Sequence, residues 1–186
     1  MKFLLTVLCS LLLAGCVTST NNAPTTNNLS LLTTGDLSFL TSNTRYFAIH
    51  PAISKAYLTD DIDSTKLMSQ FETAITEQMV NKGYQQVSYT QSPDILIGFG
   101  IATESQLSDE RILSKVGLSA GLIMEGVDTT KYEKGSVVIA LFAPNQQLPR
   151  WKALAQGLTK QDRSNDIRQE RINRVIRSML KSVPSK

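Results

Sequence analysis

An apolar run at the N-terminus limits which part of this chain can form the folded domain. Lys2 is followed by a nearly unbroken apolar stretch from Phe3 to Leu13. About 12 residues at a helical rise of ~1.5 Å span only ~18 Å, whereas a bilayer core is ~30 Å thick. A positive start, a short apolar stretch and small residues behind it are typical of a secretory signal. The run therefore predicts a segment that is removed on export, so the fold must be built from the remainder of the chain.

A cysteine closes this signal. Leu13-Ala14-Gly15-Cys16 resembles the lipobox of bacterial lipoprotein signal peptides. We therefore expect residues 1–15 to be cleaved and Cys16 to carry acyl chains, as in those lipoproteins. Each buried methylene contributes about 0.8 kcal/mol, so several chains attach a protein effectively permanently. Val17, where an Asp would retain such a protein at the inner membrane, favours the periplasmic face of the outer membrane.

The two cysteines also limit how the domain is held together. Cys9 lies in the signal and Cys16 would be acylated, so the remaining 171 of 186 residues contain no free thiol. An exported domain without disulfides needs an ordinary apolar core. The formal net charge of +3 falls to +2 once Lys2 is removed. A charge this close to neutral argues against a nucleic-acid partner.

The chain divides into a tether and one domain. Residues 17–28 are almost all Thr, Ser, Asn, Ala and Pro, which cannot bury enough surface to offset their ordering entropy. Twelve flexible residues reach about 20 Å. We assign residues 16–43 to the lipidated cysteine and tether, with the apolar clusters of 29–40 docking on the domain. Residues 44–186 are expected to form a single domain.

Two stretches predict helices with one apolar face. The first follows an acidic lead at residues 60–63 and ends at Lys82-Gly83, and the second runs from about Asp166 to Lys181. Their apolar positions are Leu67, Phe71, Ala74, Ile75 and Met79, and then Ile172, Val175, Ile176, Met179 and Leu180. Phe71 and Ile176 are predicted to face a sheet.

Five stretches predict strands. They are residues 45–49, 84–89, 94–103, 137–142 and 151–158. Within the third, Gly98 and Gly100 share a face with small residues, which predicts a helix packed closely above them. The segment 105–127 is mixed: Ser108-Asp109-Glu110 can start a helix, but three glycines weaken it. The order β, α, β, β, connection, β, β, α indicates an α+β domain.

Several short phrases carry a family resemblance. They are Tyr46-Phe47-Ala48-Ile49-His50-Pro51, Lys82-Gly83-Tyr84, Ser92-Pro93-Asp94-Ile95-Leu96-Ile97 and Arg150-Trp151-Lys152-Ala153. Over roughly residues 44–186 the chain resembles a family of bacterial outer-membrane lipoproteins known by a domain of unknown function, family 4136. The resemblance implies a two-layer α+β sandwich, with a mostly antiparallel sheet of four to five strands and two helices packed on one face. It implies no chemistry.

No catalytic or metal-binding residue can be assigned from the sequence. His50 is the only histidine, so it excludes a multi-histidine zinc site, and its place before Pro51 favours a plain loop residue over a catalytic base. Asp60, Asp61 and Asp63 lack the glycine and further ligands of a calcium loop, and are better explained as helix N-terminal charges. We therefore expect no catalytic residue, no metal and no cofactor. Trp151 is expected to be a core residue.

The last helix carries the one candidate binding face. Arg171, Arg174, Arg177 and Lys181 fall on the arc opposite its apolar stripe, with Arg168 nearer the edge. A solvated face is the simpler interpretation. The alternative is contact with anionic groups of lipid, lipopolysaccharide or peptidoglycan.

Two functions from different classes remain open. The first is a non-catalytic binding or assembly module, held at the membrane by its lipid anchor, with an envelope protein, peptidoglycan or lipopolysaccharide as candidate partner. The second is an envelope hydrolase using carboxylates alone, which needs two acidic groups roughly 5 to 10 Å apart in a cleft. Convergence of Glu104, Glu110 or Asp128 in an apolar pocket would favour the hydrolase, and a smooth groove would favour binding.

Overall fold

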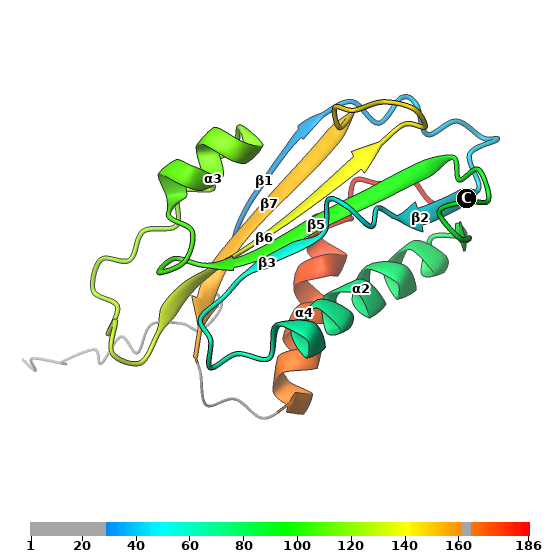
Figure 1. Ribbon diagram of the computed structural model, residues 1–186. Coiled ribbons are helices and arrows are strands. Elements are labelled where there is room, and N and C mark those ends of the chain that lie inside the picture. The colour runs from blue at the N-terminus through cyan, green and yellow to red at the C-terminus, as the bar shows by residue number, and fades with distance from the viewer. Residues whose placement is uncertain (1–28, 161–164) are drawn as a thin grey trace, which may run out of the picture.

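A single mixed sheet of seven strands forms the centre of the molecule (Figure 1). The computed structural model describes residues 29–160 and 165–186. The strand order is β1-β7-β6-β5-β2-β4, with β3 pairing with β5 as well. The strands are β1 (Leu29–Gly35), β2 (Tyr46–Ile49), β3 (Lys55–Tyr57), β4 (Gln85–Gln86), β5 (Ile95–Thr103), β6 (Glu133–Phe142) and β7 (Trp151–Thr159). The α+β class is confirmed, but the expected four to five strands are too few.

The sheet combines antiparallel and parallel pairings. The long strands β1, β7, β6 and β5 pair antiparallel, each with the next in that order. The short strands β2 and β3 both pair parallel to β5, on successive stretches of it, and β4 pairs parallel to β2. The predicted strand over residues 84–89 is reduced to the two residues of β4.

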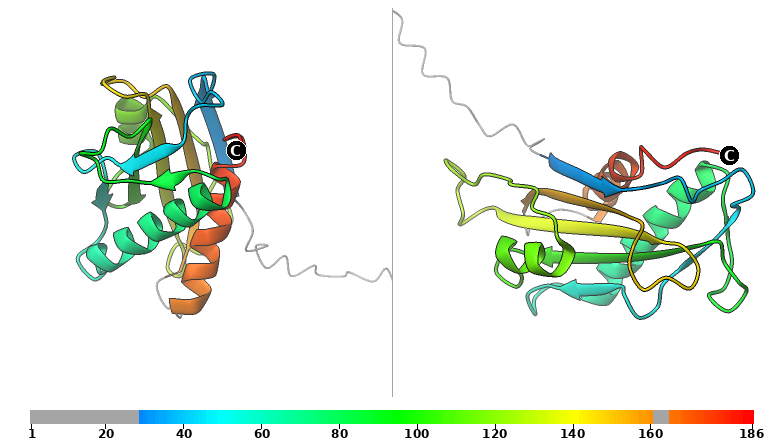
Figure 2. Two further views of the ribbon diagram at one scale, coloured as in Figure 1. Left: turned by 90° about the vertical axis from the view of Figure 1, so that its right-hand side faces the viewer. Right: turned by 90° about the horizontal axis from the view of Figure 1, so that it is seen from above.

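Helices cover both faces of the sheet, contrary to the expected two-layer arrangement (Figure 2). Helices α2 (Ser64–Asn81) and α4 (Asn165–Met179) lie on one face, as predicted. Helix α3 (Asp109–Val116) lies on the other, where its Ile112 joins a separate apolar cluster with Ala102 and Leu154. The Ser-Asp-Glu start of α3 was visible in the sequence. The sequence did not indicate which face of the sheet α3 covers.

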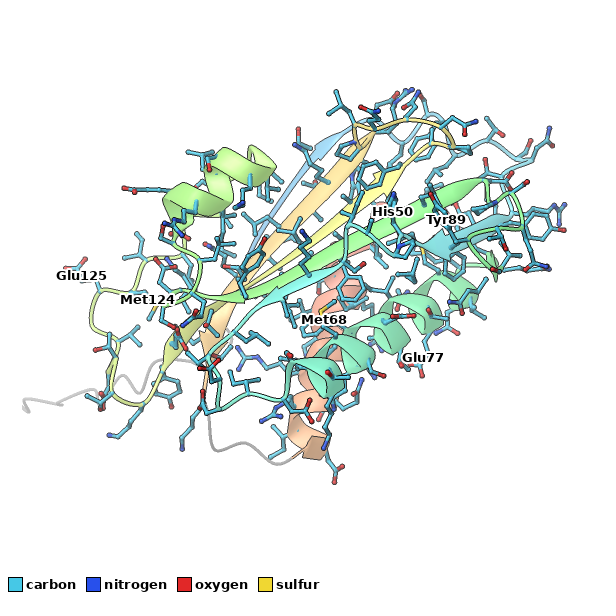
Figure 3. All side chains as sticks on the ribbon, in the orientation of Figure 1. His50, Met68, Glu77, Tyr89, Met124 and Glu125 are labelled. Carbon is cyan, nitrogen blue, oxygen red and sulfur yellow. The ribbon has the colours of Figure 1, made fainter. Side chains whose placement is uncertain are left out.

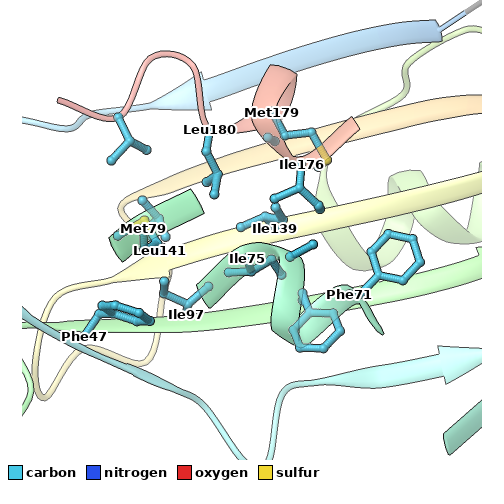
Figure 4. Packing of buried hydrophobic residues seen from close by; sticks show 14 of the residues in the cluster. Phe47, Phe71, Ile75, Met79, Ile97, Ile139, Leu141, Ile176, Met179 and Leu180 are labelled. Carbon is cyan, nitrogen blue, oxygen red and sulfur yellow. The ribbon is translucent and has the colours of Figure 1, made fainter. Parts of the chain in front are cut away.

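The main core lies between the sheet and the helices α2 and α4 (Figure 4). Phe71 is 7% exposed and Ile176 is fully buried, so both face the sheet as predicted. Trp151 is also a core residue, at 3% exposed. The buried apolar residues that the structure describes run from Leu40 to Val183. The residues that the structure describes therefore carry a complete core of their own.

Strand β1 shows how residues 29–40 dock on the domain. All seven residues of Leu29–Gly35 pair with β7, and Leu40 is part of the main core. The docking expected for residues 29–40 is thus confirmed, and the segment docks as a strand of the sheet followed by a core contact. The strand was not predicted from the sequence, because apolar and polar residues do not alternate regularly from Leu29 to Gly35. Its Ser and Thr residues also continue the composition of the tether.

The strand glycines have a different neighbour from the one expected. A Cβ on Gly98 would lie 2.7 Å from Cγ2 of Ile53, and one on Gly100 would lie 3.6 Å from the carbonyl oxygen of Lys55. Both neighbours belong to the chain entering or forming β3. Gly98 therefore makes room for Ile53 of the β2–β3 connection, whereas a Cβ at Gly100 would make only ordinary contact with β3. The prediction of a helix above these glycines was wrong.

Candidate ligand-binding cavity

A cavity of about 440 Å³ opens between the N-terminal halves of α2 and α4 and the sheet. Its floor is apolar and comes from both helices and three strands. The floor residues include Leu67, Phe71, Ile101, Val137, Ala155, Ile172 and Val175. Of these, Phe71, Ile101, Ala155 and Ile172 are buried and the others are half-buried. Leu29, the first residue of β1, also contributes to the wall.

Charged side chains surround this apolar floor. The cations are Lys66, Lys160, Arg168 and Arg171, and the acidic residues are Asp61, Asp63 and Glu133. Arg171 donates a hydrogen bond to the carbonyl oxygen of Leu158 at the end of β7. Lys66, Lys160 and Arg168 form no ion pair with any residue that the structure describes.

Two of the three acidic residues are held by nearby donors. The Oδ1 atom of Asp63 accepts a hydrogen bond from the backbone N–H of Lys66 at 2.9 Å, which caps α2. An oxygen of Glu133 accepts hydrogen bonds from both the backbone N–H and the hydroxyl of Ser105, at 3.0 and 2.5 Å. The role expected for the acidic lead, at the helix N-terminus, is therefore confirmed for Asp63.

The structure divides the predicted cationic face of the last helix. Arg174 and Arg177 are exposed on α4, and Lys181 is exposed just beyond its end. Arg174 pairs with Glu170 one turn earlier at 2.9 Å. Arg171 is half-buried and lies at the cavity, as does Arg168. The four predicted residues thus do not form one solvated surface.

The acidic groups considered for hydrolysis do not meet in the cavity. Glu104 and Asp109 lie on the opposite face of the sheet, where both pair with Lys134 of β6, at 3.2 and 2.6 Å. Glu110 is exposed on α3. Asp128 pairs with Lys131 in a turn, where the hydroxyl of Thr130, Lys131 and the backbone N–H of Thr130 lower its pKa to about 2.

The Lys134 cluster fixes the α3 segment to the sheet. Lys134 has a side chain only 7% exposed. Burial lowers the pKa of Lys134, but its bonds to Asp109 and Glu104 outweigh this effect and raise the pKa above its ordinary value. The amide of Gln156 donates to Asp109 at 2.6 Å and accepts from the backbone N–H of Leu122 at 3.2 Å. This buried polar cluster is therefore structural, and sequence spacing gave no sign of it.

His50 lies in a second hollow, of about 400 Å³, beyond the end of β2. Its ring packs against Tyr89, with 5.6 Å between ring centroids, and against Phe142 at 5.9 Å. Figure 3 shows His50 and Tyr89 side by side. The Nδ1 atom accepts a hydrogen bond from the backbone N–H of Ala52 at 3.3 Å. No hydroxyl group among the described residues bonds to the imidazole, so no nucleophile is paired with it.

Three further observations concern only residues 29–160 and 165–186. No group of three or more His, Cys, Asp or Glu side chains there could hold a metal ion. None of the helices in that part of the chain has the length and apolar character needed to cross a bilayer. Cys16, the predicted site of lipidation, and the signal peptide lie outside the described residues.

A match to a family model shows which protein family the chain belongs to. The model for a domain of unknown function, DUF4136, matches residues 35–185. The chain belongs to this family. Comparison with curated protein sequences finds no match.

Solved structures share the fold of this family member. The PelC dodecamer from Paraburkholderia phytofirmans is similar with a TM-score of 0.52 and 12% identity, over 85% of this chain and 99% of that chain. A DUF4136 family protein from Bacteroides thetaiotaomicron is similar with a TM-score of 0.50 and 14% identity, over 86% of this chain and all of that chain. At this identity the likeness shows the fold alone.

The phrases that carry the family resemblance have structural roles here. In Ser92-Pro93-Asp94, the Asp94 carboxylate accepts hydrogen bonds from the backbone N–H groups of Arg45 and Tyr46 at 2.8 and 2.9 Å and so fixes the start of β2. The Lys82-Gly83-Tyr84 phrase holds the C-terminal residues: Lys82 donates to the carbonyl of Val183, and the Tyr84 hydroxyl donates to that of Pro184. These phrases stabilise the fold and lie outside the cavity.

Proposed function

We propose that this DUF4136 protein is a lipid-anchored module at the periplasmic face of the outer membrane, and that it binds an envelope component without catalysing a reaction. The observation that carries the binding role is the cavity, which has an apolar floor and a charged rim. Three of the cations at the rim form no ion pair with a described residue. The lipobox ending in Cys16 supports the anchor, and Val17 supports the outer membrane. A concave, largely apolar site with a few polar groups is the usual form of a small-molecule binding site.

The arrangement of the acidic groups supports binding over hydrolysis. A hydrolase using carboxylates needs one group to transfer a proton and a second that is available to attack or to activate water. At the cavity, Asp63 is committed to the cap of α2 and Glu133 to Ser105. On the other face, Glu104 and Asp109 both pair with Lys134. No observation favours the hydrolase as a second candidate.

The anchor is tested by replacing Cys16 with serine. We expect Cys16→Ser to abolish incorporation of labelled palmitate and to leave uncleaved precursor, because serine cannot accept the diacylglycerol. The matched control is Cys9→Ser, which changes the other cysteine within the apolar run and should be lipidated normally. Outer-membrane vesicles separated by density should contain the Cys9 variant and lack the lipidated form of the Cys16 variant. Unchanged labelling of Cys16→Ser would refute the anchor.

A further inference from the structure

We infer that the cavity binds one acyl chain of an amphiphile whose anionic head group stays at the rim, as in a fatty acid or a lysophospholipid. This inference deepens the proposed binding function by naming the class of ligand. It depends on three properties of the cavity: the chemistry of its floor, the charges at its rim, and its place relative to the start of the domain.

The floor suits a hydrocarbon chain better than a sugar or a peptide. Phe71, Ile101 and Ile172 supply buried apolar surface, and transfer of methylene groups from water onto such surface is favourable. The Thr103 hydroxyl at the floor already has a partner, the hydroxyl of Ser105 at 3.3 Å. The Ser136 hydroxyl is turned to the opposite face of the sheet, where it accepts the Gln156 amide at 3.1 Å. A sugar would find few free hydrogen-bonding groups here, and leaving its hydroxyls unpaired is costly.

The size of the cavity favours a single chain. Ligand pockets span roughly 300 to 1,000 Å³, and this cavity of about 440 Å³ lies near the lower limit. A membrane phospholipid with two chains would need more apolar volume than the floor provides. One chain with a compact head group fits the shape better.

The rim complements a negative head group. Lys66 reaches it from α2, Arg168 from α4 and Lys160 from the end of β7, so cations come from three separate elements. None of the three forms an ion pair with a described residue, whereas Asp63 and Glu133 are held by N–H and O–H donors. A carboxylate or phosphate at the rim would therefore gain cation partners that already lie around the cavity.

The cavity lies at the end of the domain where the tether arrives. Leu29 is both the first residue of β1 and part of the cavity wall. About twelve residues separate it from Cys16, and the tether predicted from the sequence would reach only about 20 Å. With Cys16 acylated, the opening would be held close to the membrane surface, which is the source of single-chain amphiphiles in the envelope.

A fluorescent fatty acid tests this inference directly. The probe is 11-(dansylamino)undecanoate, added to a chain of residues 17–186, whose core is complete without the anchor. We expect saturable fluorescence enhancement, reversed by laurate and by lauroyl-lysophosphatidylglycerol. The order of these two competitors distinguishes a free fatty acid from a lysophospholipid as the natural source. Absence of saturable binding, or displacement by neither competitor, would overturn the inference.

Charge and shape are separated by matched variants. The rim variant Lys66→Gln/Lys160→Gln/Arg168→Gln should weaken laurate binding at least tenfold. The control Arg174→Gln/Arg177→Gln/Lys181→Gln removes three cations from the exposed side of the last helix and should change binding less than twofold. Dodecanol, which lacks the charge, should bind both variants equally. If the rim and control variants lose laurate binding equally, the loss is explained by the net charge of the protein. That result would overturn the proposed head-group site.

A substitution on the floor tests the position of the acyl chain. Val175→Phe places a larger side chain in the cavity and should abolish probe binding, while circular dichroism confirms that the variant is folded. If that variant does not fold, Val175→Met serves the same purpose with a smaller increase in volume. Binding that survives in a folded variant would place the chain elsewhere and refute the site.

The tether is the remaining candidate occupant. If the chain of residues 29–186 binds the probe and that of 17–186 does not, the tether itself occupies the cavity, which would also refute an amphiphile ligand. Loss of the amphiphile site leaves the lipidation of Cys16 unaffected, so the two proposals fail separately.

Discussion

Replacing Ile176 with alanine should lower the free energy of unfolding by about 2 to 5 kcal/mol, which is the range for replacing a large aliphatic side chain by alanine in a close-packed core. Ile176 is fully buried on α4, in the core cluster that also contains Met179 and Ile139 (Figure 4). Alanine would leave a void between helix and sheet. The measurement is equilibrium denaturation in urea of the chain of residues 17–186.

The same helix supplies a control for this prediction. Ile167 is 56% exposed on α4, so Ile167→Ala makes the same chemical change with little loss of packing. It should alter the unfolding free energy by no more than about 0.5 kcal/mol. Similar effects of the two substitutions would show that α4 is rotated relative to the sheet and would contradict the described core.

The second large effect is expected at Lys134. Lys134→Met keeps the approximate length of the side chain but removes the cation that pairs with Asp109 and Glu104. Removing one partner of a buried ion pair costs about 3 to 5 kcal/mol. The two carboxylates here are 33% and 37% exposed and can be partly hydrated, so we expect about 2 to 3 kcal/mol. The matched control, Lys131→Met, breaks only an exposed ion pair with Asp128 and should be nearly neutral.

The Lys134 contribution should also depend on pH. Its pKa in the folded protein is raised above the ordinary value. The stabilisation is therefore fully present below the pKa of the unfolded chain and is lost as the pH rises through the pKa of the folded state. Unfolding curves should show the wild type approaching the Lys134→Met variant in strongly alkaline solution. A difference that stays constant across that range would mean that packing, and not charge, accounts for the effect.

Helices α2 and α4 and strands β5, β6 and β7 were predictable because their patterns are local. Helix α2 begins at a capping aspartate and ends near Gly83, whose φ of +92° suits glycine, and the sequence contains both signals. Strands β5 and β7 contain enough apolar residues to be recognised. The parallel pairing of β2 and β3 with β5 was not predictable, because strands of three or four residues carry too little periodicity.

The candidate site was not visible in the sequence for a different reason. Its floor and rim come from residues as distant as Leu29 and Val175, which only the fold brings together. Helical periodicity placed Arg171 on the solvated side of the last helix, yet the end of β7 passes close enough to accept its hydrogen bond. The helical wheel describes one helix in isolation, so it cannot include the strand beside it. The basic character of the region was apparent, but the division of its cations between cavity and solvent was not.

The pairing of β1 with β7 has a consequence for how the chain is made. Leu29 pairs with Gly157 and Gly35 with Trp151, so the first of the described strands to be synthesised finds its partner in the last one. Contacts between such distant residues form slowly, because a long loop must close first. Until β7 emerges, the uncharged segment Leu29–Gly35 remains an unpaired strand with three leucines, a form that is prone to associate with other chains. We therefore expect the nascent protein to associate with other chains more readily before β7 is synthesised than after it.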